Sequence, residues 1–198
     1  IPLEPGGVEG DAYLNPGWKR TTFALYDVDK MVEGIPSRYE IALDQFEIKS
    51  SAGIKVLNGR RVKSFVWIDS ISNAPHFFVN GRDFKDEDQT SLSGFYEVLS
   101  EGNLSLLTRT DVVVRQPTYN EKFDLGDRDT RIIKKEKFHY LQDGMVREVT
   151  SSKKMMMALF GDHGDAMEDF IRVNRLSLNN ALHLRAIFEH YNARVASN

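Results

Sequence analysis

Hydrophobic and polar residues alternate along much of the first 150 residues with the two-residue period of β-strands. Phe46 and Ile48 would lie on one face of such a strand, and Glu47 and Lys49 on the other. The predicted strands are short and are joined by short turns, and no helical pattern separates them. This arrangement favours antiparallel pairing of neighbouring strands over parallel βαβ units.

Two dipeptides predict tight turns between strands. Asn58-Gly59 and Asp143-Gly144 each separate two β-like runs. Because Asn, Asp and Gly tolerate positive φ, each dipeptide predicts a two-residue hairpin. Two longer polar segments, residues 81–93 and 116–130, are rich in turn residues and predict surface loops.

The period changes near Ser151 from that of a strand to that of a helix. Leu184, Ile187, Phe188 and Tyr191 follow the i, i+3, i+4, i+7 spacing of an amphipathic helix, and shorter helical patterns precede them. A single helix cannot bury its own apolar stripe, so we expect these helices to pack on the sheet or on each other.

Together, the patterns predict an α+β fold that is mainly β. We expect a curved antiparallel sheet, a sandwich or an incomplete barrel, followed by two or three C-terminal helices. Residues 1–17 are rich in Gly and Pro and predict a flexible lead-in. Residues 18–150 would form the antiparallel β body, and residues 151–198 a helical segment packed on that body.

Composition narrows the classes of function. Of the 198 residues, 41% are hydrophobic and 28% charged, so the chain can bury a core without disulfides or a metal. The formal net charge of -3 leaves no basic excess for phosphates, and we expect no nucleic-acid partner. The chain has no cysteine, which excludes thiol chemistry. No apolar run approaches the roughly 20 residues of a membrane-spanning helix, so no transmembrane segment is expected.

The densest group of acidic residues and histidine lies in "LFGDHGDAMEDF", residues 159–170. Asp162, His163 and Asp165 are candidate metal ligands there. The favoured interpretation is a helix boundary, in which Asp162 caps the helix and Asp165 lies near the positive end of its dipole. Because no HExxH, phosphate-loop, GxGxxG or GxSxG motif is present, we expect no cofactor and no catalytic residue.

Aromatic residues offer a second kind of candidate site. Phe65, Trp67, Phe77 and Tyr96 lie on predicted strands and could line an apolar cavity. The alternative is that they build the core, as aromatic residues mostly do in β proteins.

Four stretches carry a resemblance to a known group: "YLNPGW", "SRYEIALDQFEIK", "GFYEVLSEGNLSLL" and "FIRVNRLSLNNALHLRAIFEHYN". In their order they resemble uncharacterised exported proteins of Gram-negative bacteria, which have a β-rich body and a short helical tail. The resemblance implies an extracytoplasmic location, in the periplasm or on the outer surface. Because the chain starts with Ile1 instead of Met, we expect that an N-terminal signal has been removed.

Three functional hypotheses follow. The first is a non-catalytic cell-envelope protein that binds or scaffolds a partner, either an envelope protein or a small ligand. The second is a carrier that holds a small apolar ligand in a β cavity. The third is a hydrolase whose carboxylates come from the two long loops, at Asp83–Asp88 and Asp124–Asp129.

Overall fold

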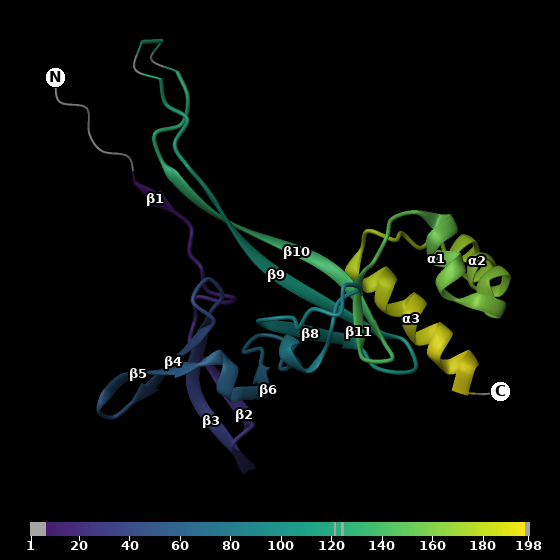
Figure 1. Ribbon diagram of the computed structural model, residues 1–198, viewed down its shortest axis with the longest axis horizontal. Coiled ribbons are helices and arrows are strands. Elements are labelled where there is room, and N and C mark those ends of the chain that lie inside the picture. Colours follow the sequence, from purple (N-terminus) through teal and green to yellow (C-terminus); the bar gives the residue numbers. More distant parts are fainter. Residues whose placement is uncertain (1–6, 121, 124, 197–198) are drawn as a thin grey trace.

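The computed structural model describes residues 7–120, 122–123 and 125–196, and within these residues the chain forms one open mixed β-sheet and three α-helices (Figure 1). Strands account for 46% of the chain and helices for 22%. The predicted class, mainly β with a curved, unclosed sheet and C-terminal helices, is confirmed. No helix in the described part of the chain is long and apolar enough to cross a bilayer.

The elements follow one another in chain order. The strands are β1 (Val8–Glu9), β2 (Lys19–Leu25), β3 (Val28–Glu40), β4 (Gln45–Ser50), β5 (Gly53–Asn58), β6 (Val62–Ile68), β7 (Pro75–Asn80), β8 (Phe95–Ser100), β9 (Ser105–Arg115), β10 (Thr130–Gln142) and β11 (Met145–Glu148). The helices are α1 (Lys153–Leu159), α2 (Gly164–Val173) and α3 (Ala181–Ala196). Short 3₁₀ turns are η1 (Gly59–Arg61), η2 (Gly81–Asp83) and η3 (Gly161–His163).

Two antiparallel meanders make up the sheet. The first runs through β2, β3, β4 and β5, and the second from β6 to β11. They join where β6 pairs with β2. Consecutive strands in both meanders pair in antiparallel fashion, as their short turns predict. The strand β1 pairs in parallel with the start of β10, which makes the sheet mixed.

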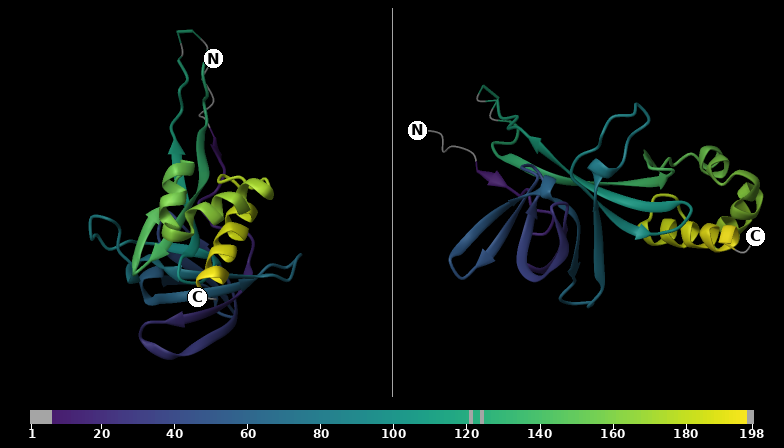
Figure 2. Two further views of the ribbon diagram at one scale, coloured as in Figure 1. Left: turned by 90° about the vertical axis from the view of Figure 1, so that its right-hand side faces the viewer. Right: turned by 60° about the horizontal axis from the view of Figure 1, so that its bottom comes forward.

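The connection from β5 to β6 requires the sheet to curl. In the order of hydrogen-bonded strands, β5 and β6 are four steps apart. Four steps across a flat sheet span about 19 Å, at about 4.8 Å a step. Only η1 joins the two strands, and a three-residue 3₁₀ turn advances about 6 Å. The strands β2 to β7 therefore wrap into an incomplete barrel, whose curvature is visible in Figure 2.

Asp143-Gly144 forms the predicted hairpin turn between β10 and β11. The two residues have φ of 51° and 76°, and Gln142 pairs with Met145. Positive φ at both central residues gives the turn a twist that matches the flanking strands. This prediction is confirmed.

Asn58-Gly59 does not join paired strands, so the hairpin predicted there is wrong. Asn58 keeps an extended backbone, and its side chain accepts a hydrogen bond from the backbone N–H of Arg60. Gly59 is buried, and a Cβ at this position would overlap the side chain of Asp44. The dipeptide therefore supplies a cap and a close backbone approach, instead of a turn with positive φ.

An aromatic core fills the incomplete barrel. Phe65 stacks on Phe78 with ring centroids 4.4 Å apart, and the ring of Phe46 meets Phe65 edge-on at 5.0 Å. The buried members of this barrel core are Phe23, Tyr39, Phe46, Val62, Phe65, Trp67, Phe78 and Phe95.

A second core lies between the helices and the sheet, at the other end of the molecule (Figures 1 and 2). The predicted apolar stripe of α3 is buried in it, with Leu184, Ile187 and Phe188 fully covered. The buried members of this helical core are Leu104, Leu106, Met156, Phe160, Met167, Ile171, Leu184, Ile187, Phe188 and Tyr191.

The strand β8 connects the two cores along its length. Phe95 belongs to the barrel core, whereas Leu99 packs against the helical core. Tyr96, between them, forms a small third cluster with Leu107 and Val146.

The strands β9 and β10 form a long two-stranded arm. Their pairing extends from Ser105 and Leu141 to Arg115 and Arg131. The predicted loop of residues 116–130 lies at the far end of this arm, which projects from the body in Figure 1.

The described part of the predicted lead-in is attached to the sheet. Residues 1–6 lie outside the described residues. The backbone N–H of Leu14 donates to the carbonyl of Tyr39. The guanidinium of Arg38 lies 4.1 Å from the ring centroid of Tyr13 and 4.8 Å from that of Trp18. A backbone carbonyl and the Arg38 guanidinium on β3 thus hold this segment. The Gly-rich composition of the segment does not predict these contacts.

Candidate functional site

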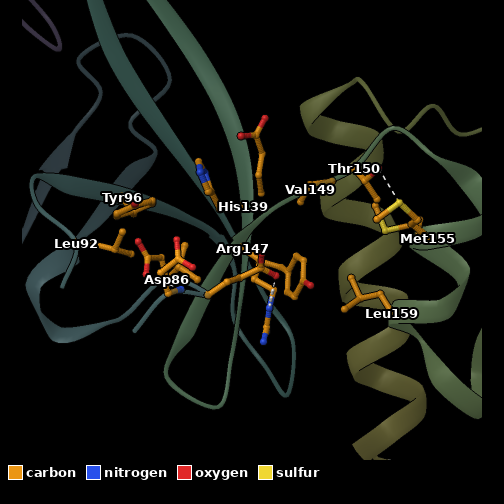
Figure 3. Close-up of a pocket in the computed structure, with 15 residues that line it drawn as sticks. Asp86, Leu92, Tyr96, His139, Arg147, Val149, Thr150, Met155 and Leu159 are labelled. Carbon is orange, nitrogen blue, oxygen red and sulfur yellow. Dashed lines mark hydrogen bonds and ion pairs between the residues drawn. The ribbon is translucent and has the colours of Figure 1, made fainter. Parts of the chain in front are cut away.

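A cleft lies where the β body meets the helical segment, and we call it the junction cleft (Figure 3). Its volume of about 440 Å³ falls within the range of small-molecule sites. The walls come from β8, β10, β11, α1 and the loop after η2. The lining residues are Asp86, Glu87, Asp88, Leu92, Tyr96, His139, Tyr140, Val146, Arg147, Glu148, Val149, Thr150, Met155, Met156 and Leu159.

The helix α1 supplies one apolar wall. Met155 and Leu159 are four residues apart and therefore share a helix face. Met156, one position further along, turns into the helical core and is fully buried, whereas Met155 is 62% exposed. Leu92 and Val149 add apolar surface from the loop and from the segment after β11. The flexible thioether of Met155 can adapt to ligands of different shape.

His139 lies deeper in the junction cleft, beside Tyr96 (Figure 3). The two rings meet edge-on with centroids 5.3 Å apart. Burial lowers the pKa of His139, and the charge of Arg109 acts in the same direction. Nδ1 of His139 lies 3.2 Å from the carbonyl oxygen of Lys137. A carbonyl only accepts, so the neutral ring carries its proton on Nδ1 and keeps Nε2 as an acceptor.

Tyr96 is held from behind by Arg109. The Tyr96 hydroxyl accepts a hydrogen bond from Nη1 of Arg109 at 3.1 Å. Nη1 also donates to the carbonyl of Ser93 at 3.0 Å, and Nε donates to Asp111 at 2.8 Å. These bonds fix the phenol ring and so the inner end of the junction cleft.

The rim of the junction cleft is acidic. Four acidic side chains and one arginine line the cleft. Glu87 is paired with Arg147 at 3.0 Å, and Glu148 with Lys137 at 3.0 Å. Asp86 accepts bonds from the backbone N–H groups of Asp88 and Thr90. The carboxylate of Asp88 forms no ion pair with any residue of the described chain, and it remains available to a cationic group.

The four aromatic candidates from the sequence do not share one cavity. Phe65 and Trp67 are 1% and 7% exposed and lie inside the barrel core. Phe77 is 36% exposed and lies on the face of β7 opposite to Phe78, because side chains alternate along a strand. Only Tyr96 lines the junction cleft.

The candidate metal ligands lie in η3 and the first turn of α2. His163 directly precedes α2, and neither η3 nor α2 has a side-chain cap, so the predicted cap by Asp162 is not formed. The ring of His163 instead meets that of Tyr191 edge-on at 5.9 Å. Among residues 7–120, 122–123 and 125–196, no group of three or more His, Asp or Glu side chains could hold a metal.

The two acidic loops lie at opposite ends of β10. Asp124 lies outside the described residues. The loop that contains Asp83–Asp88 lies beside the β10–β11 turn, because the N–H of Lys85 donates to the carbonyl of Gly144. The other loop precedes β10, a strand of 13 residues that spans about 40 Å. The described carboxylates of the two loops are therefore too far apart to form one site.

Comparisons with protein families, with curated proteins and with solved structures returned no match. The junction cleft is therefore characterised by its own geometry and chemistry. Sequence reasoning did not single out Met155 or His139. A signal for Met155 was present, because three successive methionines on a helix cannot all face the core.

Proposed function

We propose that the protein is a non-catalytic binding protein of the bacterial cell envelope, and that its junction cleft holds a small ligand with an apolar chain and a cationic group. The observation that carries the proposal is a cleft with one apolar wall and an acidic rim. In the more general form of this proposal, the same surface holds a partner protein of the envelope as a scaffold.

The apolar part of the proposed ligand follows from the wall on α1. Met155 is an exposed large hydrophobic residue beside Leu159 and Val149. Covering these side chains with a ligand would remove apolar surface from water, which contributes about 0.8 kcal/mol for each buried methylene. Binding should therefore strengthen about fourfold for each added methylene until the cleft is full.

The cationic group follows from the charge of the rim. Acidic side chains outnumber basic ones there, and Asp88 forms no ion pair among the described residues. The lowered pKa of His139 keeps its ring uncharged at neutral pH, so it adds no opposing positive charge. A fatty amine matches this distribution better than a fatty acid of equal length.

Calorimetry and thermal unfolding with alkylamines and fatty acids of graded length test the proposal. Amines should bind and raise the melting temperature, with an affinity that grows with chain length, and the acids should bind more weakly. Met155→Glu should abolish this binding, because it places a carboxylate in the apolar wall. Asp88→Asn should reduce the preference for amines over acids.

Matched controls are available on the same chain. Leu182 on α3 is 75% exposed and does not line the junction cleft, so Leu182→Glu should bind as the unchanged protein does. Asp162→Asn is the control for Asp88→Asn. Equal binding by Met155→Glu and Leu182→Glu, or no binding by either ligand series, would contradict the proposal.

The envelope location is supported by the stretches that resemble exported Gram-negative proteins. Cell fractionation of the tagged full gene product tests it separately. Recovery with the periplasm or the membranes supports the location. Recovery in the cytoplasm would contradict the location and leave the ligand proposal to its own test.

A further inference from the structure

Two turns of the barrel share one sequence pattern and one conformation. Asn-Gly-Arg occurs at residues 58–60 and again at residues 80–82. The asparagine has φ and ψ of -66° and 132° in the first turn, and of -76° and 129° in the second. In both turns its side chain accepts a hydrogen bond from the backbone N–H of the arginine, at 2.9 and 3.0 Å.

The two turns lie directly against each other. The Asn80 side chain, 3% exposed, donates to the carbonyls of Gly59 at 3.1 Å and Val62 at 2.8 Å. Nη1 of Arg82 donates to the carbonyl of Arg60 at 2.8 Å. A Cβ at Gly81 would lie 3.0 Å from the ring of Tyr96 and 3.2 Å from the carbonyl oxygen of Gly94, so a larger residue here would have to displace its neighbours. The asparagines and glycines thus have structural roles.

The side chain of Arg60 has no such role. Arg60 is exposed, and its guanidinium forms neither an ion pair nor a hydrogen bond within the described residues. Arg82 is held in place over the ring of Tyr26, 4.4 Å from its centroid, and it also lacks a carboxylate partner among these residues. The neighbouring Arg61, by contrast, is paired with Asp27 at 3.2 Å.

Both arginines line one pocket of about 380 Å³, which we call the twin-turn pocket. Ser91 and Ser93 also line it, and the Ser91 hydroxyl donates to the carbonyl of Arg82 at 3.4 Å. Asp44 also lines it, and its Oδ1 accepts a hydrogen bond from the hydroxyl of Tyr39 at 2.8 Å. The lining therefore carries two positive charges, one negative charge and several hydrogen-bond donors.

We propose that the twin-turn pocket binds the phosphate group of a small ligand. Guanidinium groups form charge-assisted, often bidentate hydrogen bonds with phosphate oxygens. A phosphate monoester carries a charge of about -1.5 to -2 at neutral pH. This charge balances that of two arginines more closely than the single negative charge of a carboxylate ligand would. The stacking on Tyr26 and the bond to the Arg60 carbonyl hold the Arg82 guanidinium in place, which lowers the entropy cost of binding. This inference does not depend on the function proposed for the junction cleft.

Titration with inorganic phosphate, followed by amide NMR shifts at constant ionic strength, tests the inference. The amides of Arg60, Ser91 and Ser93 should shift in a saturable manner. Arg60→Gln should weaken binding about tenfold, the loss expected for one charge-assisted bond. The fold should be retained in this variant, since within the described residues only the backbone of Arg60 makes hydrogen bonds.

Arg82→Gln provides a second variant, and Arg20→Gln the matched control. Arg20 is an exposed arginine on β2 that does not line the pocket, so its replacement should leave binding unchanged. Sulfate should compete with phosphate, and acetate should bind more weakly. The inference is overturned if phosphate gives no saturable shift, if acetate binds equally well, or if Arg60→Gln and Arg20→Gln bind alike.

Discussion

At several positions of this protein, contacts with residues distant in the sequence restrict which amino acid can be accommodated. Gly59 approaches the Asp44 side chain too closely for any Cβ, and Gly94 has a φ of 71°, which L-residues seldom adopt. His139 shows the same dependence in its chemistry, because burial lowers its pKa. The tertiary environment therefore sets the structural role of these glycines and the protonation of His139.

We predict that His139 makes the free energy of unfolding depend on pH. The pKa of His139 is lowered in the folded state, so the unfolded chain binds the proton more tightly. Stability is then fully present above the unfolded pKa of about 6.5 and decreases as the pH falls through the lowered folded pKa. In His139→Gln, the difference in unfolding free energy between about pH 7.5 and about pH 5.5 should be smaller.

Urea unfolding at the two pH values measures this effect, and NMR titration of the imidazole ring measures its pKa directly. The His139→Gln spectrum assigns the ring signal. A folded pKa at or above that of an unfolded peptide would contradict the prediction.

At the scale of secondary-structure elements, one side-chain amide takes the place of a backbone hydrogen-bonding partner between a helix and the sheet. The side-chain amide of Asn192 on α3 both accepts and donates hydrogen bonds to the backbone of the turn between β8 and β9. Its Oδ1 accepts from the N–H of Leu104 at 3.0 Å, and its Nδ2 donates to the carbonyls of Leu104 and Glu101 at 2.9 and 3.3 Å. Gly102 leaves room for this amide, because a Cβ there would overlap the Asn192 side chain. The helix is thus held in register with the sheet.

We predict that Asn192→Ala destabilises the protein by about 1–3 kcal/mol, because the Leu104 N–H and two carbonyls lose their partners. Urea unfolding measures the loss, and faster hydrogen exchange at the Leu104 amide should accompany it. Asn179→Ala, at an exposed position just before α3, is the control and should have little effect. Equal losses in the two variants would contradict this role for Asn192.

At the scale of the whole molecule, two cores share one sheet. The barrel core and the helical core lie at opposite ends (Figure 2). The strand β8 contributes Phe95 to one core and Leu99 to the other. Because a single strand serves both cores, we expect the body and the helical segment to unfold together.

Leu184→Ala tests this coupling. Leu184 is fully buried in the helical core, and its truncation should cost about 2–5 kcal/mol. Both tryptophans, Trp18 and Trp67, lie in the β body, so their fluorescence reports on that end and circular dichroism at helical wavelengths on the other. Both transitions should shift together.

The control for this variant is Leu182→Ala, on the same helix but 75% exposed; it should shift neither transition by more than a few tenths of a kcal/mol. A Leu184→Ala protein in which only the circular dichroism transition moves would show that the two cores unfold separately.

The sequence by itself determined the local features of this protein. Its periodicity predicted the strands, the buried stripe of α3 and the mainly β class, and Asp143-Gly144 predicted a hairpin that forms. These features depend on backbone preferences and on neighbours within a few residues. Only the tertiary structure decided the pairing of β6 with β2, which made Asn58-Gly59 a capped turn instead of a hairpin.

The candidate sites are also features that only the tertiary structure decided. The junction cleft combines residues from 86 to 159, and the twin-turn pocket brings Arg60 beside Arg82. Such proximity depends on which distant surfaces are buried together, and no local pattern in the sequence records that choice. Of the four aromatic residues that the sequence offered as ligand contacts, Phe65 and Trp67 fill the barrel instead, since burying them stabilises the fold.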